Sequence, residues 1–155
     1  MSTTTVIPPA RAVELAEQRC GVYRDELGWN TFRDGRTGAV VLRADRQWAV
    51  IVPKAFGLQL RSRLRERPAP MFSIDRAMWV FITGRPGTVI DRAEVSVSLT
   101  RLGAVPVLPG ATVALPTPGD HRRCWLDAPG RVRVLPSFGV VVDALLAAGE
   151  ADRWP

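Results

Sequence analysis

Residues 78–83 read MWVFIT, an uninterrupted apolar run followed by the turn-forming residues 84–87, GRPG. A short apolar run between turn signals predicts a strand that is buried on both of its faces. Such a strand lies in the middle of a sheet, and other layers must cover both sides of that sheet. This run constrains the fold more than any other segment of the chain.

Three segments have the pattern of an amphipathic helix. Val13, Ala16, Cys20 and Tyr23 recur at helical spacing, and Ser137 is suited to cap the last helix. We therefore expect helices over residues 10–27, 55–67 and 138–149.

Short β-rich runs separated by Gly, Pro and Asp predict further strands. The alternation of Val95, Val97 and Leu99 also favours a strand over a helix. We expect strands over residues 39–43, 47–52, 94–102, 104–108, 112–115 and 123–126, with the first two joined as a hairpin through residues 44–46.

The length of 155 residues corresponds to one domain. The sequence has no internal repeat and no linker, so we interpret residues 1–9 as a flexible N-terminal arm and residues 10–155 as a single domain. The predicted fold class is α+β, with a mixed or antiparallel sheet and flanking helices.

The two cysteines, Cys20 and Cys124, are far apart in the sequence. A secreted disulfide scaffold usually has more cysteines at closer spacing, so we expect two free, buried thiols. The first nine residues lack the basic and apolar regions of a secretory signal, and no apolar stretch reaches the roughly 20 residues of a membrane span. We expect a cytoplasmic protein with no membrane partner.

Residues that commonly carry catalysis are scarce. His121 is the single histidine, which excludes a metal site built on several histidines, and no Walker-type phosphate loop occurs. Asp120, His121 and Cys124 are close enough in sequence to suggest a Cys–His nucleophile, but we favour a turn histidine beside a core cysteine. The sequence predicts no catalytic residue, no metal site and no cofactor.

The charge of the chain is its most informative bulk property. Twenty-one basic and fifteen acidic residues give a net charge of +6, and Lys54 is the single lysine. Guanidinium groups bind phosphate bidentately, so this excess suits an anionic partner such as DNA or RNA. The alternative is a solvated basic surface. The candidate contacts form two clusters, Arg61, Arg63, Arg65 and Arg67 in the second helix, and Arg122, Arg123, Arg131 and Arg133 near the C-terminus.

The order of segments resembles the N-terminal domain of bifunctional DNA primase–polymerases, in particular the small actinobacterial type. The pieces that match are the turn Thr37-Gly38, the run VPKAFG at 52–57, MWVF at 78–81, ATVALPT at 111–117, RCWL at 123–126 and LPS at 135–137. The resemblance covers residues 10–149 and implies a primase–polymerase-like fold.

The chain departs from that family at the positions of its chemistry. Active members carry two aspartates that bind a divalent metal, and the resemblance places them at Val50 and Val52. The family's histidine falls at Met78 and a third acidic residue near Pro106. Hard cations need oxygen ligands, so the resemblance implies a fold that has lost metal-dependent polymerisation.

Three functions are compatible with these features. The first is a catalytically inactive, nucleic-acid-binding accessory protein that contacts phosphates through its arginine clusters. The second is a protein–protein adaptor that presents a strand edge or an exposed tryptophan. The third is a nucleotide-handling enzyme that uses other residues.

Overall fold

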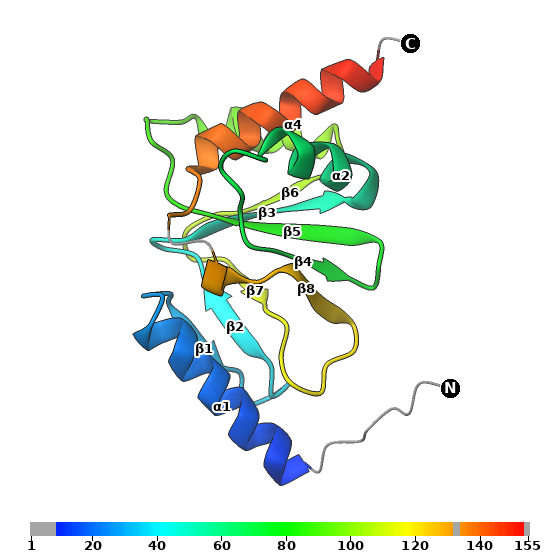
Figure 1. Cartoon of the computed structure of the whole chain (residues 1–155). Coiled ribbons are helices and arrows are strands. Elements are labelled where there is room, and N and C mark those ends of the chain that lie inside the picture. The colour runs from blue at the N-terminus through cyan, green and yellow to red at the C-terminus, as the bar shows by residue number, and fades with distance from the viewer. Residues whose placement is uncertain (1–8, 132–133, 154–155) are drawn as a thin grey trace, which may run out of the picture.

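The computed structural model describes residues 9–131 and 134–153. Figure 1 shows the arrangement of the helices and strands within these residues. The elements, in chain order, are α1 (Pro9–Asp25), β1 (Thr31–Arg33), β2 (Val40–Arg43), β3 (Trp48–Pro53), α2 (Lys54–Arg63), β4 (Met71–Ile74), β5 (Met78–Thr83), α3 (Arg92–Thr100), β6 (Val105–Val107), β7 (Thr112–Ala114), β8 (Arg123–Asp127), the 3-10 helix η1 (Pro129–Arg131) and α4 (Phe138–Arg153).

The strands form two antiparallel sheets, which confirms the α+β class. The smaller sheet has the order β1-β2-β7, and the larger sheet has the order β6-β3-β5-β4-β8. The expected hairpin of residues 39–43 and 47–52 is wrong, because β2 pairs with β1 and β7 whereas β3 pairs with β5 and β6. The residues between β2 and β3 carry the chain from one sheet to the other.

Strand β5 is the middle strand of the larger sheet, as its apolar run predicts. Trp79 and Phe81 point into one hydrophobic core, and Val80 and Ile82 point into another. Alternate residues of a strand face opposite sides of its sheet. A continuous apolar sequence is therefore required here, because both sides are buried.

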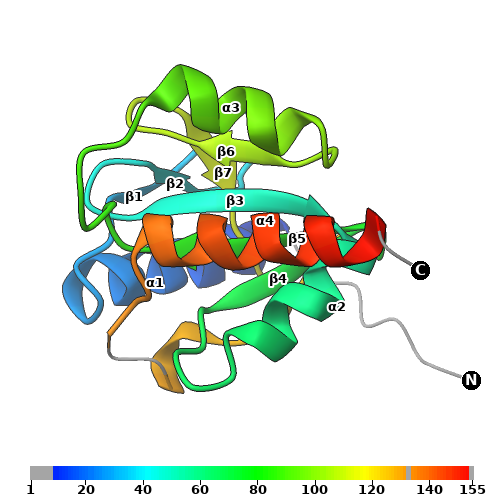
Figure 2. The same cartoon turned by 90° about the horizontal axis from the view of Figure 1, so that it is seen from above.

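The two cores lie on opposite faces of the larger sheet. Helices α2 and α4 cover one face, and Figure 2 shows α4 crossing over β3 and β5 with α2 beside it. The smaller sheet and α1 cover the other face, where Tyr23 and Trp29 stack on each other with their ring centroids 5.5 Å apart. Trp125 of β8 donates a hydrogen bond of 3.0 Å from Nε1 to the Tyr23 hydroxyl, and so ties α1 to the larger sheet.

The first and last helices agree with the sequence prediction, with different ends. Helix α1 begins at Pro9, one residue earlier than expected. Proline suits the first helical position, because a backbone N–H at that position would have no partner within the helix. The remainder of the expected arm, residues 1–8, lies outside the described residues. Ser137 caps α4 by accepting a hydrogen bond at Oγ from the Val140 N–H.

The expected strand over residues 94–102 is wrong, because residues 92–100 form α3. Asp91 caps this helix and accepts hydrogen bonds from the N–H groups of Ala93 and Glu94. An aspartate followed three residues later by a glutamate is typical of a helix start. This local signal determines the structure, and the alternation of apolar residues does not.

Among the described residues, no helix has both the length and the apolarity that crossing a membrane requires.

Candidate functional site

Of the positions that the family resemblance assigns to metal binding, Val50 and Pro106 are cross-strand partners in β3 and β6, but neither side chain offers an oxygen ligand. Val50 and Val52 have no exposed surface and lie in the core beneath α2 and α4. Met78 pairs with Pro53 at the start of β5 and, by the alternation of the strand, faces the opposite side of the sheet from Trp79. Among residues 9–131 and 134–153, no cluster of three His, Cys, Asp or Glu side chains could hold a metal ion.

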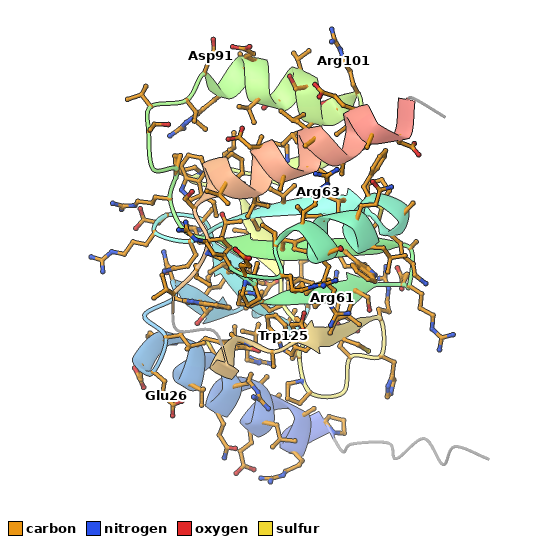
Figure 3. The ribbon with its side chains drawn as sticks, turned by 45° about the horizontal axis from the view of Figure 1, so that its top comes forward. Glu26, Arg61, Arg63, Asp91, Arg101 and Trp125 are labelled. Atoms are coloured by element: carbon orange, nitrogen blue, oxygen red, sulfur yellow. The ribbon has the colours of Figure 1, made fainter. Side chains whose placement is uncertain are left out.

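The first arginine cluster is less uniform than the sequence predicts. Helix α2 ends at Arg63, so Arg65 and Arg67 lie in the turn that follows it and not on a helical face. Arg61 forms an ion pair of 3.0 Å with Asp127 at the end of β8. Figure 3 shows Arg61 on the side of α2 near β8, and Arg63 farther from that strand. Arg63, Arg65 and Arg67 are exposed, and none of them has an ion pair within the described residues.

The second cluster is held in place by aspartates. Arg122 donates from Nε and Nη2 to the two carboxylate oxygens of Asp75 at 3.0 and 2.7 Å. Arg123 donates from Nη1 to Asp120 at 3.1 Å. Arg131 lies in η1, and Arg133 falls outside the described residues. Two of the four predicted arginines are therefore brought together at the start of β8.

Arg122 and Arg123 line a cleft of about 830 Å³. Its walls are the first turn of α1, the connection between β1 and β2, and the loop between β7 and β8. Arg33 at the end of β1 and Arg36 in the β1–β2 connection line the same cleft, and Asp120 is the one carboxylate among its described lining residues. We call this cavity the arginine cleft.

The β1–β2 wall is a tightly hydrogen-bonded turn. The carboxylate of Asp34 accepts from the Arg36 N–H at 3.0 Å and from the Thr37 hydroxyl at 2.7 Å. These hydrogen bonds, the Thr37 hydroxyl foremost, hold the pKa of Asp34 below its usual value. Gly38 closes the turn with a φ of 75°, a left-handed conformation that favours glycine. The turn that carries Arg33 and Arg36 is thus ordered by the protein itself.

The β7–β8 wall is fastened to the smaller sheet. The Thr117 hydroxyl accepts a hydrogen bond of 2.9 Å from the N–H of Val40 and donates one of 3.0 Å to the carbonyl of Leu115. Asp120 accepts from the N–H of Arg122 at 2.9 Å as well as from the Arg123 guanidinium. The backbones of both walls are therefore preformed, and aspartates fix the side chains of Arg122 and Arg123.

The side chains of Arg33 and Arg123 each have a buried hydrogen-bond donor without an acceptor. Within the described residues, three buried side-chain polar atoms lack a hydrogen-bond partner, and two of them are the Nε atoms of Arg33 and Arg123. Arg33 is half-buried, and no acceptor or carboxylate of the described chain contacts its guanidinium. A partly buried charge without a counterion is destabilising. An anion in the cleft would offset this cost.

The two cysteines differ in their exposure. Cys124 is exposed on β8, so the expectation that both cysteines are buried is correct for Cys20 and wrong for Cys124. The pattern of β8 explains this, because Trp125 faces the core while Cys124 and Leu126 face away from it. No hydrogen bond joins Cys124 to His121 within the described residues.

Sequence reasoning missed Arg33 and Arg36. Neither lies in a basic run, and each is flanked by turn residues of the segment RDGRTG at 33–38. The only signal was the density of turn formers between two short strands, which is typical of loops that carry function. Pairing of β1 with β2 and of β2 with β7 brings this turn beside Arg122 and Arg123.

Comparison of the chain with models of protein families, with curated proteins and with solved structures found no significant match. The geometry of the arginine cleft therefore carries the functional argument.

Proposed function

We propose that this chain is a catalytically inactive, primase–polymerase-like protein that binds nucleic acid as an accessory factor. In this proposal two groups of arginines contact phosphates. One group lines the arginine cleft, and the other consists of the exposed arginines at the end of α2 and directly after it, Arg63, Arg65 and Arg67, which we call the exposed arginines after α2. The contacts carry no sequence information, because phosphates are the same at every nucleotide.

One observation carries the proposal. Arg33 is half-buried in the cleft, and its guanidinium has no counterion among the described residues. Arg122 and Arg123 each have an aspartate partner, whereas Arg33 and the exposed Arg36 have none in the described chain. The cleft thus retains positive charge and donors suited to the bidentate recognition of a phosphate.

Strand β8 connects the cleft to the other arginines. Arg123 begins this edge strand, and Asp127, the partner of Arg61, ends it. Four residue steps along a strand span about 13 Å. A single strand of nucleic acid that follows β8 can therefore reach both groups of arginines, and Arg63 and Arg65 add charge at the far end.

The resemblance to primase–polymerases supplies the non-catalytic part of the proposal. The positions it assigns to metal ligands carry Val50, Val52 and Met78, and the two valines are sealed in a core. No carboxylate is available there to align a nucleotide and its metal ion. We expect no templated incorporation of nucleotides with Mg²⁺ or Mn²⁺.

Binding of labelled oligonucleotides at low salt tests the proposal. We expect single-stranded and duplex oligonucleotides of unrelated sequence to bind with similar affinity. Replacing Arg33 and Arg123 together with Gln should weaken binding to all of them. As a charge-matched control, Arg92→Gln with Arg101→Gln alters the first residue of α3 and the residue that follows this helix. Neither residue lines the cleft, so the control should leave binding nearly unchanged.

A protein–protein adaptor is the second candidate. Strand β8 is an edge of the larger sheet, and its outer face presents Cys124 and Leu126, the latter 39% exposed. Strand edges pair readily with extended peptides. Absence of any nucleic-acid binding at low salt would favour this function.

A further inference from the structure

We infer that the arginine cleft receives a terminal phosphate monoester, so that the protein recognises the phosphorylated end of a nucleic-acid strand in preference to its interior. This inference rests on the proposed nucleic-acid function. It assigns the cleft a role that the exposed arginines after α2 do not share.

Access to the arginines is the first reason. Arg123 has a side chain only 22% exposed, and Arg33 is half-buried between the turn at Gly38 and the rest of the cleft. An internal phosphodiester carries chain on both sides, so it reaches exposed arginines on a surface more easily than recessed ones. A terminal phosphate can enter the cleft end-on.

Charge is the second reason. Asp75 and Asp120 form ion pairs with Arg122 and Arg123, whereas Arg33 has no ion pair among the described residues and Arg36 has only the longer-range attraction of Asp34 in its own turn. An internal phosphodiester has one negative charge, whereas a phosphate monoester carries about −1.5 to −2 at pH 7. The second charge of the monoester can attract both Arg33 and Arg36, neither of which has a close ion pair within the described residues. It also offers three oxygens as acceptors, enough to engage more than one guanidinium.

The size of the cleft is the third reason. Its volume of about 830 Å³ is much larger than a phosphate group needs, and Val13, Ala39 and Ala114 provide apolar surface in its lining. Binding sites commonly combine such surface with a few placed polar groups. The cleft therefore has room for the sugar and base that follow the terminal phosphate.

The test compares one fluorescent oligonucleotide sequence with a 5′-phosphate, a 3′-phosphate or only hydroxyl ends, by anisotropy at a fixed salt concentration. We expect one of the two phosphorylated strands to bind about tenfold more tightly than the hydroxyl-ended strand, a difference of about 1.4 kcal/mol. Inorganic phosphate and a nucleoside monophosphate serve as competitors. They test whether the cleft binds a free phosphate group or a free phosphate monoester without the rest of the strand.

Arg33→Lys keeps the net charge but removes the planar fork, and we expect it to reduce the preference for phosphorylated ends to less than twofold. Arg101→Lys, directly after α3 and outside the cleft, is the matched control and should retain the preference. Circular dichroism of Arg33→Lys verifies that the variant is folded, and Arg36→Lys provides a second variant at an exposed position of the same cleft.

Each other outcome has a separate meaning. Equal binding of all three ends would overturn the inference and leave the proposed function intact. Displacement by a nucleoside monophosphate without any oligonucleotide binding would assign the cleft to a free nucleotide and overturn both. No binding of any strand would also remove the proposed function on which the inference rests.

Discussion

The guanidinium of Arg122 and the carboxylate of Asp75 join the β7–β8 loop to the β4–β5 turn. The Arg122 side chain donates to both carboxylate oxygens, and the Asp75 N–H donates to the Arg122 carbonyl at 2.8 Å. Asp75 and Arg76 have φ values of 50° and 61°, which non-glycine residues seldom adopt. The pair therefore links an unusual turn to one wall of the arginine cleft.

The first prediction concerns the titration of this pair. The hydrogen bond from Arg122 holds the pKa of Asp75 below its usual value. Its contribution to stability is therefore present above the unfolded pKa of about 3.9 and is lost as the pH falls through the folded pKa. In a carboxyl NMR titration, Arg122→Gln should raise the pKa of Asp75 toward its ordinary value. Salt should have the same effect, since exposed charges are screened. An ordinary Asp75 pKa in the unmodified protein would contradict this account.

The second prediction concerns the central strand. Phe81 is 1% exposed and lies in the core beneath α2 and α4. Phe81→Ala should lower the free energy of unfolding by about 3–5 kcal/mol, because it removes apolar contacts and leaves a cavity. Leu58→Ala is the control, since Leu58 lies on the exposed side of α2, and it should change stability by less than about 0.5 kcal/mol. Denaturant unfolding measures both. A loss below about 1 kcal/mol for Phe81→Ala would show that β5 is peripheral.

The third prediction concerns the contact between α2 and β5. A Cβ at Gly57 would lie 2.8 Å from the ring of Trp79, so the helix can approach the sheet this closely only with glycine. Gly57→Ala should destabilise the protein although alanine favours helices. Gly21→Ala, in α1 with only ordinary contacts around it, should stabilise by roughly 0.5–1 kcal/mol. Thermal unfolding of the two variants compares the effects, and a stabilising Gly57→Ala would refute the close approach.

The sequence predicts the elements whose patterns are local. The apolar run of β5 identifies the central strand, and Ser137 correctly marks the start of α4. The alternation over 94–102 misleads, because the cap at Asp91 and the packing of Leu99 in the core favour a helix. The short strands β1 and β4 went unrecognised, since three or four residues give too little periodicity.

The candidate site could be predicted only in part. Arg122 and Arg123 stand out as a basic pair, and the structure places both in the cleft. Their neighbour Arg33 comes from a segment about ninety residues earlier, and strand pairing alone brings it there. Such a meeting of distant residues depends on sheet order, which local patterns do not contain. The exposure of Cys124 likewise depends on β8 being an edge strand.

The dependence of nucleic-acid affinity on salt tests the central claim most directly. Each phosphate that an arginine neutralises on duplex DNA contributes about −0.9 to the slope of log affinity against log salt. About four contacts, two in the cleft and two after α2, should give a slope of roughly −3 to −4. Arg33→Gln combined with Arg123→Gln should flatten the slope by about 1.8. The control pair at the two ends of α3, Arg92→Gln with Arg101→Gln, should leave the slope unchanged. Fluorescence anisotropy across a salt series measures all three proteins. No binding at low salt, or a slope that the two cleft substitutions do not alter, would contradict phosphate binding in the arginine cleft.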